Sequence, residues 1–525
     1  MGKNGRNGAG GGVRSVLFIT ADQWQARCLS VLGHDCVRTP HLDALAADGV
    51  LFRNHFAQCS PCSPARTSLL TGLYLMNHRS VVNGTPLDTR HSNIALEVRK
   101  AGYDPTLFGY TDTAADPRAL PANDPRLRSY EGVLPGMSVG VQMSSEFKPW
   151  RAFLKAKGYD VPAAPLDVFK PAGVTAGANG NGRPHPMFSA EDSDTAFVAD
   201  QVLRHLAIHE GESWFVHPVF MKPHPPLIAP QPYNTLYQRD AVPGLQRLCG
   251  PADEAAQHPY LGYLLRCQQR PGYYWGHDGN IQEVDADAIA DMRAVYYGLI
   301  SEVDDQVGRI IEHLKRTGDY DHTLIVFTSD HGEMLGDHWL FGKEGYFDPA
   351  YHIPLIIRDP RPEAAGRRGT VVDAFTESVD IKPTILDWLG LDVPMTCDGV
   401  SLVPYLEGRT PSKWRSEVHW EFDFRDIVDQ KPETELGLTS DQCTLCVIRD
   451  ERYKYVHFTA LPPLFFDLET DPHEFHDLAR DPAHQGLLLD YAQKMLSWRM
   501  AHDERAMTNA FLTPEGVVER RGPRH

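Results

Sequence analysis

The 525-residue sequence has no hydrophobic run near the roughly eighteen residues that a membrane-spanning helix requires. The apolar stretch at residues 16–20 is too short even for the hydrophobic region of a signal peptide. Cysteine is sparse, and nine cysteines, an odd count, are scattered over the chain. This fits a reducing compartment better than a disulfide framework. We therefore expect a cytoplasmic protein without a membrane partner.

The sequence also lacks an excess of positive charge. It has 51 Lys and Arg residues against 69 Asp and Glu residues, for a formal net charge of -18. Nucleic acids and anionic membranes bind basic surfaces, so we expect no nucleic-acid partner. A small anionic substrate remains compatible with this charge, because local positive charge at a site can oppose the overall sign.

Strand and helix patterns alternate over most of the chain. Strand patterns occupy residues 13–20, 50–56, 106–110, 214–220 and 323–328, and helical patterns occupy residues 40–47, 94–100, 194–209 and 286–316. This alternation predicts an α/β fold, a mostly parallel sheet with helices on both faces. Residues 225–278 show no clear period, and we expect them to cover the site.

The pattern changes after about residue 416. Short strand patterns at residues 418–424, 445–449 and 453–458 precede a helical pattern within residues 481–502. They predict a smaller unit on an antiparallel sheet. We predict three parts: a flexible Gly-rich arm at residues 1–12, the main α/β domain at residues 13–415, and a C-terminal α+β unit with its tail at residues 416–525.

The most specific motif is the segment Cys62-Ser63-Pro64-Ala65-Arg66-Thr67-Ser68-Leu69-Leu70-Thr71-Gly72. It matches Cys-x-Pro-x-Arg followed by Thr-Gly, five fixed positions over eleven residues. A lone cysteine is usually a small buried hydrophobe, but a match of this length favours a functional Cys62. A helix opening at residues 67–70 would place Cys62 near a helix N-terminus, where partial positive charge favours an anion.

Polar side chains follow two of the predicted strands. Asp22 and Gln23 come after the first strand of the main domain, and Asp330 and His331 come after the strand at residues 323–328. Ligands of open α/β sheets bind at the carboxyl ends of the strands. Two carboxylates, an amide oxygen and an imidazole suit a hard or borderline divalent cation such as Mn²⁺ or Ca²⁺. A single Asp there is more often a cap, but beside the motif these residues favour a metal site.

On these residues the sequence resembles the formylglycine-dependent sulfatases of the alkaline phosphatase superfamily, and most closely the phosphonate monoester hydrolases. Further stretches that carry the resemblance are Ile19-Thr20-Ala21-Asp22-Gln23-Trp24, Leu73-Tyr74-Leu75-Met76-Asn77-His78-Arg79, Lys222-Pro223-His224-Pro225-Pro226, Thr328-Ser329-Asp330-His331-Gly332-Glu333 and Pro463-Leu464-Phe465-Phe466-Asp467-Leu468. The resemblance implies an alkaline-phosphatase-like α/β/α sandwich. It also implies metal-dependent hydrolysis of phosphonate monoesters and phosphate diesters, with promiscuous sulfatase activity. The alternatives are a dedicated arylsulfatase and, less favoured, a non-catalytic binding protein on the same fold.

The resemblance also implies the roles of individual residues. A maturation enzyme would oxidise Cys62 to formylglycine, whose hydrate is the nucleophile. One divalent ion, preferably Mn²⁺ with Ca²⁺ as the alternative, would be held by Asp22, Gln23, Cys62, Asp330 and His331. The other catalytic residues would be Arg66, His224 and Lys343, and the substrate-binding residues Asn83, Tyr110 and Asp112. The family also tends to form homo-oligomers, so we expect a dimer or tetramer.

The segment Gly109-Tyr110-Thr111-Asp112 departs from the relatives. Typical sulfatases carry Gly-Lys-x-His there, and losing the Lys and His removes positive charge beside the transferred group. Tyr110 supplies a neutral donor instead, which favours phosphonate monoesters and phosphate diesters over sulfates. The phosphonate hydrolases place a threonine where this chain has Asp112. A carboxylate there would repel an anionic substrate unless it is protonated or paired with Lys343 or Arg66. It could instead bind a cationic part of the substrate or point away.

Overall fold

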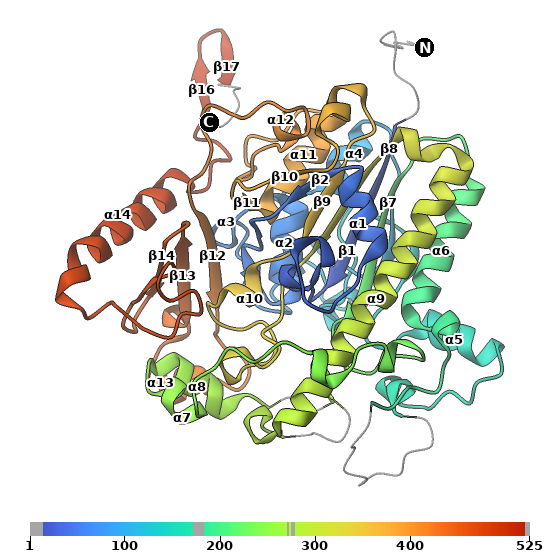
Figure 1. Cartoon of the computed structure of the whole chain (residues 1–525). Helices are drawn as coiled ribbons and strands as arrows, with labels where there is room; N and C mark the ends of the chain where they lie inside the picture. Colours follow the sequence, from blue (N-terminus) through green and yellow to red (C-terminus); the bar gives the residue numbers. More distant parts are fainter. Residues whose placement is uncertain (1–13, 172–182, 270–271, 275–278, 520–525) are drawn as a thin grey trace.

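The computed structural model describes residues 14–171, 183–269, 272–274 and 279–519 (Figure 1). The arm predicted at residues 1–12 lies outside them. The main sheet has eight strands in the order β10-β2-β9-β8-β1-β7-β5-β6. They are β1 (Ser15–Asp22), β2 (Val50–Phe52), β5 (Pro105–Gly109), β6 (Ser138–Gln142), β7 (Phe215–Pro223), β8 (Thr323–Ser329), β9 (Leu355–Arg358) and β10 (Thr370–Val372). Only the two pairings of β9, with β2 and β8, are antiparallel, so the predicted mostly parallel sheet is confirmed.

Helices cover both faces of this sheet, and β1 shows how. Leu17 and Ile19 join the core beneath α1 (Pro40–Ala47), α6 (Asp194–Ile208) and α9 (Ala286–Thr317). Val16 and Phe18 point the other way, into the core beneath α2 (Cys62–Thr71), α4 (Ile94–Lys100) and α11 (Ile381–Trp388). A strand buried on both faces has to be a continuous apolar run, as this one is. The predicted α/β/α sandwich is therefore confirmed.

Most predicted bounds differ from the structure by a few residues at most, but a strand and a helix differ by more. The strand pattern at residues 50–56 divides at the bend of Arg53 and Asn54, and only β2 enters the main sheet. The remainder, β3 (His55–Phe56), pairs with β11 (Thr376–Glu377) in a separate sheet. Helix α2 begins at Cys62, ahead of the predicted start at residues 67–70. Its first turn includes Pro64, and a helix tolerates proline in the first turn because the N–H groups there have no intrahelical partner.

The C-terminal region forms the predicted second sheet, with the order β15-β14-β13-β12-β4. Strands β12 (Val418–Asp423), β13 (Thr444–Arg449), β14 (Tyr453–Phe458) and β15 (Leu464–Asp467) are antiparallel neighbours. Helix α14 (Gln485–Ala501) packs on this sheet through Tyr491, Met495 and Trp498. The fifth strand, β4 (Cys59–Ser60), pairs parallel with β12 and directly precedes α2. The boundary at residue 416 stays a prediction.

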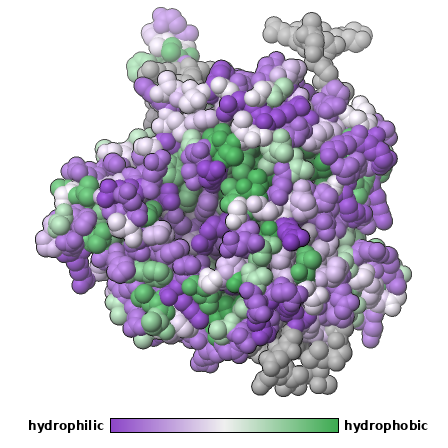
Figure 2. All heavy atoms as spheres, viewed as in Figure 1, coloured by the Kyte–Doolittle hydropathy of each residue, from purple (hydrophilic) through white to green (hydrophobic). Residues whose placement is uncertain are grey.

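The segment between β7 and α9 contains the short helices α7 (Pro251–Ala255) and α8 (Pro259–Cys267). The side chain of Gln268 bonds the backbone N–H and C=O of Phe341, at 3.0 and 2.7 Å, and so joins this segment to the loop after β8. The surface in Figure 2 is mostly hydrophilic, with apolar residues gathered near the middle of that face. Across the described ranges, no helix is long and apolar enough to cross a membrane.

Candidate active site

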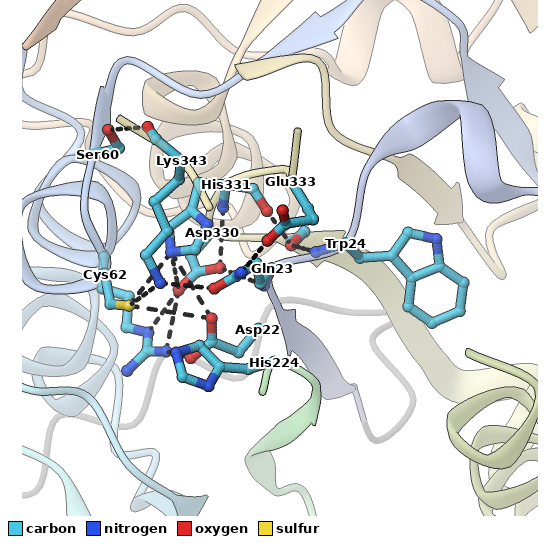
Figure 3. Close-up of polar contacts among 12 residues, drawn as sticks. Asp22, Gln23, Trp24, Ser60, Cys62, His224, Asp330, His331, Glu333 and Lys343 are labelled. Atoms are coloured by element: carbon cyan, nitrogen blue, oxygen red, sulfur yellow. Dashed lines mark hydrogen bonds and ion pairs between the residues drawn. The ribbon is translucent and has the colours of Figure 1, made fainter. Parts of the chain in front are cut away.

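Two neighbouring parallel strands bring the acidic residues of the site together. β1 and β8 run side by side with Ala21 opposite Ser329. Asp22, the last residue of β1, and Asp330, the residue after β8, therefore lie at the same edge of the sheet. Gln23 and His331 follow them and lie in the same cluster (Figure 3). Gln23 has a positive φ of 68°, which is rare for a residue with a side chain. Its N–H donates to Asp330 Oδ1 at 3.1 Å, which holds this conformation at the site.

Cys62 reaches this cluster from the first turn of α2. Its Sγ lies 3.2 Å from His331 Nε2, 3.2 Å from Lys343 Nζ and 4.0 Å from Asp22 Oδ1. Burial, reinforced by the charge of Asp22, raises the pKa of the Cys62 thiol to about 12. An unmodified thiol here stays protonated near neutral pH and is a poor nucleophile.

Four side chains of the cluster offer a set of metal ligand atoms. One atom each from Asp22, Cys62, Asp330 and His331 lies within 4.8 Å of the others, and all four residues are buried. Burial raises the pKa of Asp330 to about 6, and Asp22 adds to the shift. Burial would also raise the pKa of Asp22, but the nearby cationic groups outweigh it and hold that pKa below its usual range. Oxygen and imidazole donors of this kind fit a hard or borderline divalent ion.

Arg66 holds three carboxylates of the site. Its guanidinium lies 2.5 Å from Asp22 Oδ2, 2.9 Å from Asp330 Oδ2 and 2.6 Å from Asp112 Oδ2. It also lies over the ring of Tyr110, 4.2 Å from the centroid. Of the arrangements left open for Asp112, the structure therefore shows pairing with Arg66. Burial nevertheless raises the pKa of Asp112 to about 6, against the opposing charge of Arg66.

The remaining predicted residues surround the cluster at different depths. The hydroxyl of Tyr110 donates to Asp22 Oδ2 at 2.6 Å. Asn83 is exposed, and its Oδ1 accepts the Ser63 N–H at 3.0 Å, so it caps α2 from outside the helix. His224 is half-buried; its Nδ1 lies 2.7 Å from the Pro225 carbonyl oxygen, and burial lowers its pKa to about 4. The neutral imidazole therefore carries its proton on Nδ1 and a lone pair on Nε2.

Two residues without a predicted role belong to the site. The carboxylate of Glu333 accepts hydrogen bonds from Gln23 Nε2 and the Tyr273 hydroxyl. Tyr273 comes from the segment between β7 and α9 and also lies 2.9 Å from Gln23 Nε2. Glu333 could have been suspected from its place in the polar stretch after β8. No spacing in the sequence indicates Tyr273, because its segment has no period.

The fold and site define an alkaline-phosphatase-like α/β/α protein with a buried cluster of metal-type ligands at the carboxyl edge of its sheet. A profile of the sulfatase family matches residues 14–391, and a profile of the N-sulphoglucosamine sulphohydrolase C-terminal region matches residues 336–501. The first match covers more than half of the chain. The chain belongs to the sulfatase family.

Three relatives resemble nearly the whole chain. It is 44% identical over 516 residues to the multifunctional alkaline phosphatase superfamily protein PehA of Trinickia caryophylli, covering 97% of this chain and 99% of that protein. The structure of the phosphonate monoester hydrolase of Agrobacterium radiobacter has a TM-score of 0.94 and 46% identity, covering 97% of this chain and 100% of that one. The phosphonate monoester hydrolase of Silicibacter pomeroyi has a TM-score of 0.91 and 44% identity, with 97% and 99% covered. The predicted family and fold are confirmed.

Proposed function

We propose that this chain is a metal-dependent hydrolase of phosphonate monoesters and phosphate diesters, with promiscuous activity toward aryl sulfates. The observation that carries the proposal is Cys62 Sγ, held 3.2 Å from both His331 Nε2 and Lys343 Nζ inside the acidic cluster. The surrounding fold is similar to two phosphonate monoester hydrolase structures, at 46% and 44% identity. Tyr110 at the site keeps a neutral donor where sulfatases place positive charge.

The donor set supports one divalent ion at the acidic cluster. We propose Mn²⁺, with Ca²⁺ as the alternative, and its ligands would be Asp22, Gln23, Asp330, His331 and the modified Cys62. Such an ion acts as a Lewis acid and lowers the pKa of a hydroxyl bound to it. The protonated thiol explains why Cys62 would need conversion to formylglycine, whose hydrate carries two hydroxyls at this position. A maturation enzyme is therefore a proposed partner.

The cationic side chains would bind and orient a monoanionic ester. Burial would lower the pKa of Lys343, but nearby acidic groups, among them the carboxylates of Asp22 and Asp330, keep that pKa above its usual range, so the ammonium stays charged. It lies beside Cys62 Sγ, where it can stabilise negative charge that develops on the transferred group. His224 leaves Nε2 available to exchange a proton with the leaving-group oxygen, once its pKa is raised by a bound anion.

The substrate preference is tested by comparing kcat/KM for p-nitrophenyl phenylphosphonate, bis-p-nitrophenyl phosphate and p-nitrophenyl sulfate. We expect the phosphonate and the diester to lead, and a clear lead of the sulfate would favour the arylsulfatase alternative. Cys62→Ala should abolish turnover of all three. Mass spectrometry of the tryptic peptide containing Cys62 should find it lighter than its thiol form. An unmodified, inactive protein would favour the binding-protein alternative.

We also propose that the chain forms a homo-oligomer, a dimer or tetramer, through its C-terminal region. The hairpin of β16 (Ala510–Thr513) and β17 (Gly516–Glu519) projects from the molecule as a separate two-stranded sheet (Figure 1). It exposes Phe511, Leu512 and Val517 by 73%, 79% and 61%. An isolated two-stranded hairpin is at best marginally stable in water, so a second copy would stabilise it.

We propose a cytoplasmic location as well. All nine cysteines fall within the described residues, and none of them forms a disulfide. Eight of them are buried or half-buried, and Cys249 is exposed. Buried thiols such as these act as small side chains rather than crosslinks. A reducing compartment suits such a set of thiols. Fractionation of the producing cells, followed by detection of the full chain, tests the location.

A further inference from the structure

The side-chain amide of Gln23 lies between a cation and a carboxylate. Its Oε1 is 2.6 Å from Lys343 Nζ, and its Nε2 donates to Glu333 and lies 2.9 Å from the Tyr273 hydroxyl. An ammonium group only donates hydrogen bonds, and an ionised carboxylate only accepts them. Both neighbours therefore impose the same orientation, with the amide oxygen facing Lys343 and the nitrogen facing Glu333.

Glu333 is itself held in place by the backbone. Only 1% of the residue is exposed. Its Oε1 accepts hydrogen bonds from the N–H groups of Leu335 at 3.0 Å and Gly342 at 2.6 Å. Its Oε2 accepts hydrogen bonds from Gln23 Nε2 and the Tyr273 hydroxyl. Because each carboxylate oxygen has two donors, the group cannot turn without losing hydrogen bonds. Gly342 directly precedes Lys343, so the same carboxylate fixes the peptide that leads to this lysine.

Hydrogen bonds fix the backbone of Gln23, so only the orientation of its side-chain amide remains to be set. The Gln23 carbonyl accepts the Tyr296 hydroxyl at 2.6 Å, and its N–H donates to Asp330. In Figure 3, Glu333 lies on the side of Gln23 away from Cys62. The orientation of the amide therefore decides whether an oxygen or an NH₂ group faces the side of the cluster where Cys62 and Lys343 lie.

We infer that Glu333 is a positioning residue that sets the orientation of the Gln23 amide, and that Tyr273 supports it from the segment between β7 and α9. Glu333 thereby determines that this chain presents an oxygen at Gln23 to the divalent ion. The inference rests on the metal site of the proposed function. Partners behind a metal ligand commonly tune affinity in this way, and their loss weakens binding roughly 10–100-fold.

The first test is Glu333→Gln, measured by calorimetric titration of metal-stripped protein with Mn²⁺. The new amide oxygen can keep the N–H groups of Leu335 and Gly342, which turns its NH₂ group toward Gln23 Nε2. Two donors then face each other, whereas turning the Gln23 amide over would set its NH₂ group against the Lys343 ammonium. We therefore expect the amide to lose its single orientation. Mn²⁺ binding should weaken roughly 10–100-fold. This measurement needs no substrate, and the wild type and the variant are compared at the same extent of Cys62 conversion, as measured by mass spectrometry.

The second test exchanges the two groups in Gln23→Glu/Glu333→Gln. A carboxylate at position 23 accepts on both sides, from the new amide and from Lys343, and the total charge of the pair is unchanged. We expect the exchange variant to bind Mn²⁺ at least about fivefold more tightly than Glu333→Gln does. Tyr273→Phe keeps the ring and removes one donor to Glu333, and it should weaken binding by a smaller factor than Glu333→Gln.

Glu254→Gln is the matched control for the loss of a buried carboxylate. In the wild type, Glu254 Oε2 lies 3.0 Å from His338 Nδ1. The Mn²⁺ affinity of Glu254→Gln should equal that of the wild type. Wild-type affinity in folded Glu333→Gln, or no recovery in the folded exchange variant, would overturn the inference. If circular dichroism shows Glu333→Gln unfolded, two results together would overturn the inference: wild-type Mn²⁺ affinity in Tyr273→Phe, and an affinity of the folded exchange variant that is roughly 100-fold or more below the wild type.

The outcomes for the wild type separate this inference from the proposed function. A wild type that binds no Mn²⁺ would overturn the metal site and the inference together. A wild type that binds Mn²⁺ but hydrolyses none of the three esters would overturn the proposed function, while the affinities of the variants would still decide the role of Glu333.

Discussion

At the scale of single residues, the site is a balance of buried charges. Asp22, Asp112 and Asp330 supply three carboxylates, and Arg66 and Lys343 supply two cations within hydrogen-bond distance of the cluster. Buried charges are tolerated only when they are paired, and Arg66 pairs with all three carboxylates. The divalent ion of the proposed function would turn this excess of one negative charge into an excess of one positive charge, so that a chain with a net charge of -18 could still receive an anion at its site.

The raised pKa of Asp112 predicts how kcat/KM depends on pH. Its carboxyl, with a pKa raised to about 6, is neutral below that pH and negative above it, where it opposes an anionic substrate. We expect the ratio of kcat/KM for Asp112→Asn to that of the wild type to rise severalfold between about pH 5 and about pH 8 on p-nitrophenyl phenylphosphonate. Taking the ratio cancels the ionisations that both proteins share. A ratio that stays constant across this range would show that the charge of Asp112 does not reach the substrate.

At the scale of elements, one helix caps another. The N-cap Thr39 gives α1 no side-chain hydrogen bond, and Asp304 on α9 supplies it instead. Its carboxylate accepts the N–H groups of His41 at 3.1 Å and Leu42 at 2.8 Å. The cluster of His41, Asp304 and Asp305, whose ligand atoms also lie close together, is therefore already used in joining α1 to α9. A cap from a distant helix fixes the angle at which the two helices meet.

The Asp304 cap predicts a pH-dependent stability. Burial raises the pKa of Asp304 from 3.8 to about 7, so the folded state holds this proton more tightly than the unfolded state. Wild-type stability should therefore fall as pH rises from about 4 to about 7, by at most about 4 kcal/mol. Asp304→Asn should lack this decline and be about 1 kcal/mol less stable than the wild type near pH 5. Urea unfolding at several pH values measures both, and parallel profiles would contradict the expectation.

At the scale of the whole molecule, the two sheets meet at the nucleophile position. β4 adds to the C-terminal sheet beside β12, and α2 with Cys62 starts directly after it. The same helix packs through Leu69 and Leu70 into the core of the main sheet. The helix that carries Cys62 is therefore held by both sheets, and the C-terminal unit is part of the frame of the site.

The C-terminal hairpin gives a prediction about assembly. Phe511 and Val518 are paired across β16 and β17 and expose 73% and 56% of their surface. In Phe511→Asp/Val518→Asp two charges replace this apolar pair, and burying them in an interface would be costly. We expect light scattering to report fewer subunits than in the wild type. Glu515→Gln, at the turn of the same hairpin, should keep the wild-type mass. An unchanged mass in the double variant would place the interface elsewhere.

Much of this molecule is determined by local pattern. The helices at residues 40–47 and 94–100 have the bounds that the sequence predicts, because a helical period and its end signals lie within one segment. The motif beginning at Cys62 identifies the candidate nucleophile without any structure. Asp22 and Asp330 also follow from the sequence, since the ends of parallel strands meet at one edge.

Only the tertiary structure decided how the site residues are paired. Arg66 meets Asp112 across 46 positions of sequence, and Gln23 meets Glu333 across 310. Tyr273 reaches the same carboxylate from a segment without any pattern, and Asn83 caps α2 from outside it. Such contacts depend on how distant elements pack against each other, and the local periodicity of the sequence does not predict this packing. The sequence by itself therefore determined the elements, the family and the candidate chemistry, whereas packing decided which group holds each ligand in place.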